Sequence, residues 1–206
     1  MRVPLVLVVA ISTVTAPLAG AQAQRAAAGL VVAEGIVFVN DQPVAATAEA
    51  SGLPDTAVVR VAQGRAAVAL KRGGWLFLDA DASVRVIGNG ALNFNRLEVL
   101  TGSAIVASGT SSPLVACESD IRLSDAGIFR FDVQPLNADG DRPCQFRVFE
   151  GSAAVPLTSV IAALRAGQMM KCNRRCGDMI PKNEFATSQL DEFDQWARRT
   201  LESLRR

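Results

Sequence analysis

The stretch FRVFEGSAAV, which runs from Phe146 to Val155, follows a pattern that the sequence uses more than once. LEVLTGSAIV (97–106) and VRVAQGRAAV (59–68) repeat its order. In each stretch an apolar residue, a charged residue and Val are followed by two further residues, Gly, and four residues that end in Val. LVVAEGIVFV (30–39) is a looser copy. An interior glycine in a strand marks a bulge, a tight bend or a close backbone approach, so we expect bends there. Chance likeness between Val-rich strands is the alternative. The shared glycines are Gly35, Gly64, Gly102 and Gly151.

Apolar and charged residues alternate along these strands. Phe129 and Phe131 flank Arg130, and the same alternation surrounds Arg60 and Glu98. We interpret the apolar positions as the buried face and the charged positions as the face that meets water, as in an antiparallel sheet. The sequence therefore predicts a mostly β fold across residues 30–168, an antiparallel β roll or sandwich with glycine-marked bends.

The clearest helical pattern lies at the end of the chain, between Ser188 and Leu204. Ser188 and Asp191 match a capping box, which predicts that the helix begins at Ser188. We therefore predict a C-terminal amphipathic α-helix over residues 188–206 and a disulfide-bearing loop over residues 169–187. The apolar residues recur at steps of three and four, and they are Leu190, Phe193, Ala197, Leu201 and Leu204, with Trp196 beside them.

The apolar stripe of this helix needs a surface to pack against. We favour the chain's own β domain, because amphipathic helices usually cover the core of their own fold. A partner protein is the alternative, and in that case Phe193, Trp196 and Leu201 are the candidate partner contacts.

The first 23 residues have the layout of a secretory signal peptide. Arg2 precedes an apolar run that reaches about Val14, and small residues follow up to Ala21-Gln22-Ala23. This pattern predicts cleavage after Ala23 and export to the periplasm or the outside of the cell. An uncleaved anchor is the alternative, but the apolar run is shorter than the ~20 residues that span a bilayer. No second run is long enough, so we expect no stable membrane span after cleavage.

Four cysteines, Cys117, Cys144, Cys172 and Cys176, would meet an oxidising compartment after export. Two disulfides are therefore the expected arrangement. The sequence leaves the connectivity open, with a preference for Cys117 with Cys144 and Cys172 with Cys176. A zinc site or a redox pair is disfavoured, because the chain has neither a histidine nor a C-x-x-C pair.

Residues suited to catalysis or cofactor binding are scarce. The absence of His excludes a Ser-His-Asp or Cys-His apparatus and the common His-bearing metal sites. Asp79 and Asp81 could form an acidic pair, but a turn between two strands explains them better. PLNADGDRP (135–143) resembles part of a calcium loop, yet it lacks the required ligands, and a hairpin loop is the better interpretation. We expect no catalytic residue, no metal and no cofactor.

Several phrases together resemble the FecR-like domain of bacterial envelope proteins. AGIFRFDV (126–133) is similar to the family's Gly-x-aromatic-Arg strand, and FRVFEGSAAV to the strand pair that follows it. LRAGQ (164–168) is similar to its closing turn, and LDEFDQWARR (190–199) to the Phe-Asp-x-Trp ending of stand-alone members. The resemblance implies a β-rich envelope domain without enzymatic activity. In multi-domain members this domain relays a signal from an outer-membrane receptor to a cytoplasmic sigma factor.

These observations predict a non-catalytic exported protein that acts as a binding or signalling module. Its partner is expected to be an envelope protein or polymer. The formal net charge of +1 gives no electrostatic footprint for nucleic acid. A structural scaffold of the cell envelope is the alternative function, and a hydrolase that uses carboxylates is a remote third. The oligomeric state stays open.

Overall fold

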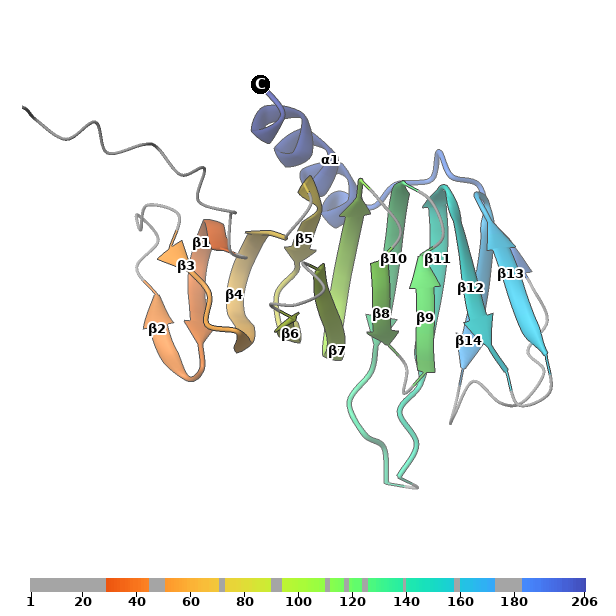
Figure 1. Cartoon of the computed structure of the whole chain (residues 1–206), viewed down its shortest axis with the longest axis horizontal. Coiled ribbons are helices and arrows are strands. Elements are labelled where there is room, and N and C mark those ends of the chain that lie inside the picture. Colours follow the sequence, from red (N-terminus) through yellow and green to blue (C-terminus); the bar gives the residue numbers. More distant parts are fainter. Residues whose placement is uncertain are drawn as a thin grey trace, which may run out of the picture.

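The computed structural model describes residues 29–44, 51–70, 73–89, 94–109, 112–116, 119–123, 126–138, 140–157, 160–172 and 183–206. Fifteen strands and one helix lie within these residues, which confirms a mostly β fold with a C-terminal helix. Figure 1 shows the strands side by side along the long axis, with the helix over one end of the central strands.

In chain order the strands are β1 (Gly29–Val39), β2 (Gln42–Val44), β3 (Ser51–Gly52), β4 (Thr56–Ala69), β5 (Trp75–Leu78), β6 (Ser83–Asn89), β7 (Phe94–Ser108), β8 (Ser112–Ala116), β9 (Ser119–Leu123), β10 (Gly127–Val133), β11 (Cys144–Glu150), β12 (Ser152–Pro156), β13 (Ile161–Arg165), β14 (Gln168–Cys172) and β15 (Asn183–Glu184). The helix α1 spans Glu192–Leu204.

The long strands change partners half-way along their length. In β4, residues 56–60 pair with β6 and residues 66–69 pair with β5. In β7, residues 94–101 pair with β6, whereas residues 102–108 pair with β10. The two halves therefore lie in two layers, the first continued by β8, β9, β12 and β13 and the second by β10, β11, β14 and β15. Among the described strands, only β7 and β8 pair in parallel.

The glycines of the repeated pattern stand where the chain passes from one layer to the other. Gly35, Gly64, Gly102 and Gly151 have φ of +85°, +83°, +81° and +84°, a region that L side chains rarely adopt. Gly35 and Gly64 lie opposite each other in the β1–β4 ladder. A methyl group on Gly64 would lie closer to the carbonyl oxygen of Glu34 than the 3.0 Å that real Cβ atoms keep. The predicted glycine-marked bends are confirmed.

The main core fills the space between the two layers. The rings of Phe131 and Phe146 stack with their centres 4.6 Å apart, and the ring of Phe129 lies 6.4 Å from that of Phe146. All three side chains are fully buried. Ile121 of β9 and Leu164 of β13 belong to the same cluster from the other layer. Burial of these apolar groups is the main driving force that holds the layers together.

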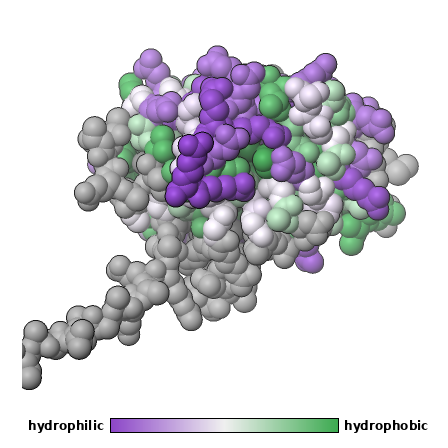
Figure 2. All heavy atoms as spheres, turned by 90° about the horizontal axis from the view of Figure 1, so that it is seen from above, coloured by the Kyte–Doolittle hydropathy of each residue, from purple (hydrophilic) through white to green (hydrophobic). Residues whose placement is uncertain are grey.

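A second apolar cluster lies on the outer face of β4, β5 and β7, under helix α1. Phe193, Trp196 and Leu201 are buried in it, and the ring of Trp196 meets that of Phe77 edge-on at 5.9 Å. The stripe therefore packs on the chain's own sheet, which is the arrangement that the sequence favoured. Seen from the side of the helix, the described surface is mostly hydrophilic, and its hydrophobic residues form small separate patches (Figure 2).

The helix begins later than the sequence predicted. Asp191 is the N-cap, and its carboxylate accepts a hydrogen bond from the backbone N–H of Asp194, whose own carboxylate accepts one from the N–H of Asp191. The prediction of a cap at Ser188 is wrong. Ser188 lies in a turn, where its carbonyl oxygen accepts the N–H of Leu190, so the helix cannot start there.

The sheet also reaches into the segment that the sequence assigned to a loop, residues 169–187. Strand β14 pairs with β11, and the short strand β15 pairs with β14. Met170 and Cys172 are buried while Lys171 is exposed, which is the alternation of a strand with one covered face.

The predictions of a signal peptide and of no stable membrane span concern residues that the structure leaves undescribed or describes only in part. The signal peptide, residues 1–23, lies outside the described residues. Within the described part of the chain, no helix has the length and apolar character needed to cross a membrane.

We expect Gly64→Ala to lower the free energy of unfolding by about 3 kcal/mol or more. The left-handed backbone costs an L side chain ~1–2 kcal/mol, and the added methyl also meets the backbone of β1. Gly140→Ala is the matched control, because Gly140 has φ of +75° but no atom within 4 Å of the added methyl. Its loss should stay near ~1 kcal/mol. Urea unfolding measures both, and equal losses would contradict the proposed close approach.

Candidate functional site

Arg130 lies in the middle of β10, and its side chain is only 8% exposed. Its Nε donates to Asp132 at 2.9 Å, and its Nη1 donates to Asp191 at 2.5 Å and to Asp194 at 2.8 Å. The guanidinium also lies 5.5 Å from the ring centre of Phe193. One side chain therefore joins a central strand to the first turn of α1.

The alternation along β10 predicts that Arg130 faces water, and this prediction is wrong, because Arg130 is buried. Arg130 does point away from the main core, since its neighbours Phe129 and Phe131 are buried there. Alternation identifies the side of the sheet but not what covers that side. The cover is α1, whose N-cap Asp191 lies 61 residues further along the chain.

Asp132 brings a second arginine into the same cluster. Its Oδ2 accepts a hydrogen bond from Arg147 of β11 at 2.7 Å, and its Oδ1 accepts one from the hydroxyl of Ser103 of β7 at 2.7 Å. The ladders place Asp132 directly opposite Ser103, so neighbouring strands supply these groups in one row. We call this set the Arg130 cluster, and it consists of Ser103, Arg130, Asp132, Arg147, Asp191 and Asp194.

The charges of the Arg130 cluster shift one another's pKa values. Burial disfavours the charged form of Arg130, but the carboxylates of Asp132, Asp194 and Asp191 outweigh it and raise the pKa of the guanidinium. Burial also tends to raise the pKa of Asp191. The hydrogen bond from the backbone of Asp194 and the nearby Arg130 guanidinium outweigh burial and hold that pKa below its usual value. Both groups are therefore charged at neutral pH.

Three further polar contacts hold the rest of α1 to the sheet. They are Arg65 with Glu192 at 3.0 Å, Trp196 Nε1 with Glu34 at 3.2 Å, and Arg198 with Glu150 at 3.2 Å. Each of them has at least one partner that is well exposed to solvent, so each contributes ~1 kcal/mol or less. Among the polar contacts of α1, those of the Arg130 cluster are the buried ones.

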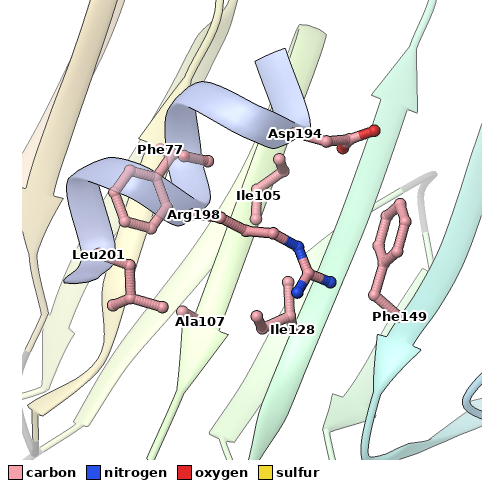
Figure 3. A pocket seen from close by; sticks show the side chains of 9 residues that line it. Phe77, Ile105, Ala107, Ile128, Phe149, Asp194, Arg198 and Leu201 are labelled. Atoms are coloured by element: carbon pink, nitrogen blue, oxygen red, sulfur yellow. The ribbon is translucent and has the colours of Figure 1, made fainter. Parts of the chain in front are cut away.

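A small apolar pocket lies between α1 and the sheet, beside the Arg130 cluster. Its cavity volume is about 10 Å³, room for about one water molecule, and the wider space around it opens to solvent. Figure 3 shows that Arg198 extends from α1 across this space toward Ile128 and Phe149. The remaining lining residues are Phe77, Ile105, Ala107, Asp194, Ala197 and Leu201. No sequence pattern indicated this pocket, because its walls come from four strands and the helix.

The acidic segments that the sequence offered as possible catalytic or metal sites lie in turns and loops. Asp79 and Asp81 lie at the turn between β5 and β6, as predicted, and Asp79 accepts a hydrogen bond from Arg65 at 3.2 Å. Asn137 lies in the loop between β10 and β11 and accepts one from the backbone of Asp141 at 2.8 Å. In the part of the chain that is described, no three side chains of Cys, Asp or Glu are placed to hold a metal ion.

The cysteines can be placed in part. Cys144 of β11 and Cys172 of β14 lie opposite each other, both are buried, and neither has a free thiol. Cys117 and Cys176 lie outside the described residues. The connectivity of the disulfides therefore stays a prediction.

Comparison with known proteins shows a likeness of fold. No family model and no curated protein matches the sequence. Two crystal structures of a "putative anti-sigma factor" from Parabacteroides distasonis ATCC 8503 are similar to this chain. For the structure at 2.50 Å the TM-score is 0.54, with 16% identity over 65% of this chain and 62% of that chain. For the structure at 1.65 Å the values are 0.53, 15%, 64% and 61%. The chain thus covers less than two thirds of the length of either.

We expect Arg130→Met to lower the free energy of unfolding by about 3–5 kcal/mol, because it leaves Asp194 buried without its partner. Arg85→Met is the matched control on the opposite layer. Arg85 pairs with Glu98, and the two side chains are 40% and 35% exposed, so this loss should stay below ~1 kcal/mol. Chemical unfolding of the two variants measures both values. Losses of similar size would show that the Arg130 cluster is an ordinary surface network.

The lowered pKa of Asp191 predicts a dependence on pH. The usual value is 3.8, and the folded value is lower, so the ionised group stabilises the fold above that pH. This contribution is lost as the pH falls through the lowered pKa. Asp191→Asn keeps a capping oxygen but has no charge, and it should cost ~1 kcal/mol at pH 7. The difference between wild type and variant should be constant above about pH 5 and shrink toward pH 2. A difference that grew on acidification would refute the charge assignment.

Proposed function

We propose that this chain is a FecR-like envelope protein without catalytic activity, and that it acts as a binding or signalling module. The observation that carries the proposal is the contact between Arg130 and the acids of the first helical turn. Arg130 belongs to the phrase AGIFRFDV, and Asp191 and Asp194 belong to LDEFDQWARR. Two of the phrases on which the resemblance rests therefore meet in one buried interaction.

The likeness of fold supports the same proposal. The similar solved structures are those of a protein described as an anti-sigma factor, which is a signalling class. Arg130 is paired with both Asp132 and Asp194, an arrangement suited to holding a helix in place. We therefore assign no reaction to the cluster.

The compartment and partner follow from the sequence. The signal-peptide pattern of residues 1–23 supports export to the periplasm or the cell exterior. In that compartment two disulfides among the four cysteines would stabilise the β domain. The partner is an envelope protein or polymer, and no nucleic acid or cofactor is required.

Photo-crosslinking in intact cells of the native host tests the function. A photoreactive residue replaces Arg199 on the helix, Gln42 on the edge strand β2, or Ala163 on the edge strand β13, all of which are exposed. A binding module should give one discrete product with a different envelope component, from the helix position and not from all three. Products between copies of the chain at both sheet edges would favour the scaffold and contradict the proposal. Products with cytoplasmic proteins alone would contradict the assigned compartment.

A further inference from the structure

We propose that a polar cavity on the outer face of β10, β11 and β14 binds a uronic acid unit of an acidic glycan, with the sugar ring in the cavity and its carboxylate on Lys171. The inference rests on the proposed function only in taking the partner to be an envelope polymer. It follows from the position and size of the cavity, from the hydrogen-bonding groups that line it and from the charge of Lys171.

The cavity lies beside the Arg130 cluster, on the same face of the sheet. Asp132 belongs to both, and it follows Arg130 by two residues, so the two side chains lie on one side of β10. The ladders place Gln145 opposite Asp132 and Lys171 opposite Gln145, which makes one row of side chains across three strands. The lining residues are Asp132, Gln134, Pro143, Cys144, Gln145 and Lys171.

The size of the cavity suits one ring. Its volume is about 180 Å³, and an engineered cavity of ~150 Å³ in another protein holds benzene, so a six-membered ring can enter. Pockets for drug-sized ligands and cofactors start at ~300 Å³. Because the cavity opens to solvent, the substituents of a bound ring can extend outward and continue into a polymer.

Two side-chain amides in the cavity have hydrogen-bonding groups to offer. Gln145 donates through Nε2 to the sulfur of Met169 at 2.9 Å, but a thioether is a weak acceptor, and Gln145 makes no other side-chain hydrogen bond to a described residue. The amide of Gln134 is exposed and makes none within the described ranges. The carboxylate of Asp132, in contrast, already accepts from three donors of the Arg130 cluster. An amide both donates and accepts, as a sugar hydroxyl does, so the two amides match a ring that carries hydroxyl groups.

The charges around the cavity favour one negative charge on the ligand. Lys171 is exposed and forms no ion pair with any residue that the structure describes, so its three N–H donors are available. Asp132 is paired with both Arg130 and Arg147, and its charge therefore opposes an anion only weakly. A carboxylate carries one charge and matches a single ammonium group. A phosphate carries ~1.5–2 negative charges and would leave part of its charge without a partner.

A six-membered ring with hydroxyl groups and one carboxylate is the chemistry of a hexuronic acid. None of the described residues that line the cavity is aromatic, so a nucleobase would find no ring to stack on. Pro143 offers an apolar surface to the C–H side of a sugar ring. The acidic side chain of a peptide would satisfy Lys171 but leave the amides of Gln134 and Gln145 without new partners.

The test is methyl NMR titration of the mature full chain with methyl α-D-glucopyranosiduronate and, separately, with the neutral methyl α-D-glucopyranoside. The methyl signal of Met169 should shift, because its sulfur contacts Gln145, whereas that of Met170, which belongs to the main core, should stay in place. The uronate should bind about five- to ten-fold more tightly than the glucoside, because hydrogen bonds to a charged group are the stronger ones.

Exposed positions supply the variants, so the fold is not at risk. Lys171→Gln should remove the preference for the uronate. Gln134→Glu adds a negative charge to the lining, and it should weaken the uronate several-fold while the glucoside binds as before. Arg122→Gln is the matched control, because Arg122 is an exposed cation on β9 in the other layer, and its removal should change neither affinity.

Three results would overturn the inference: equal affinity for the uronate and the glucoside, a preference for the uronate that persists in Lys171→Gln, or propionate binding as tight as that of the uronate. Propionate has the carboxylate without the ring, so the last result would indicate a site for any carboxylate, including that of a peptide.

The outcome for the proposed function can be separated from this one. A heterologous cross-link in cells together with no uronate binding would overturn this inference and leave the proposed function standing. Uronate binding in the cavity with no heterologous cross-link would contradict the proposed function alone.

Discussion

The buried guanidinium of Arg130 is the constraint on which the arrangement of helix and sheet depends. A charge with 8% of its side chain exposed has to be paired, because an unpaired buried charge costs several kcal/mol. One partner, Asp132, comes from the same strand, but the others come from α1. The first turn of the helix must therefore lie over β10, and this fixes where the apolar stripe behind it packs. The capping box contributes to the same attachment, because Asp191 and Asp194 cap the N-terminus of the helix and also bind Arg130.

The glycine corners make this arrangement possible. Strands β4 and β7 change layers at Gly64 and Gly102, and beyond these bends their alternate residues face the main core and α1. Val68 and Val106 belong to the main core, whereas Ala67 and Ile105 belong to the cluster under α1. The helix covers the outer face of β4, β5 and β7, and its polar contact with β11 is the partly exposed pair of Arg198 and Glu150. The pocket under Arg198 lies beside this pair.

The sequence predicted the layers of this fold better than it predicted their contacts. Period-two alternation and the recurrent glycine are local signals, and they identified the strands and the bends. The stripe of Phe193 and Leu201 is also local, and it indicated which face of the helix is buried. The cap was assigned to Ser188 instead of Asp191, because both residues fit a capping pattern and only the path of the chain distinguishes them. The burial of Arg130 could not be read from its neighbours, since the cover comes from a distant segment.

The central claim is that Arg130 fastens α1 to the sheet, and hydrogen exchange in Arg130→Met tests it most directly. If the claim holds, the backbone amides of α1 lose protection to a much greater extent than those of β10 and β11, because the helix detaches before the core opens. Equal loss of protection in the helix and in these two strands would contradict the claim. It would mean that Arg130 stabilises the fold as a whole and not the attachment of the helix in particular.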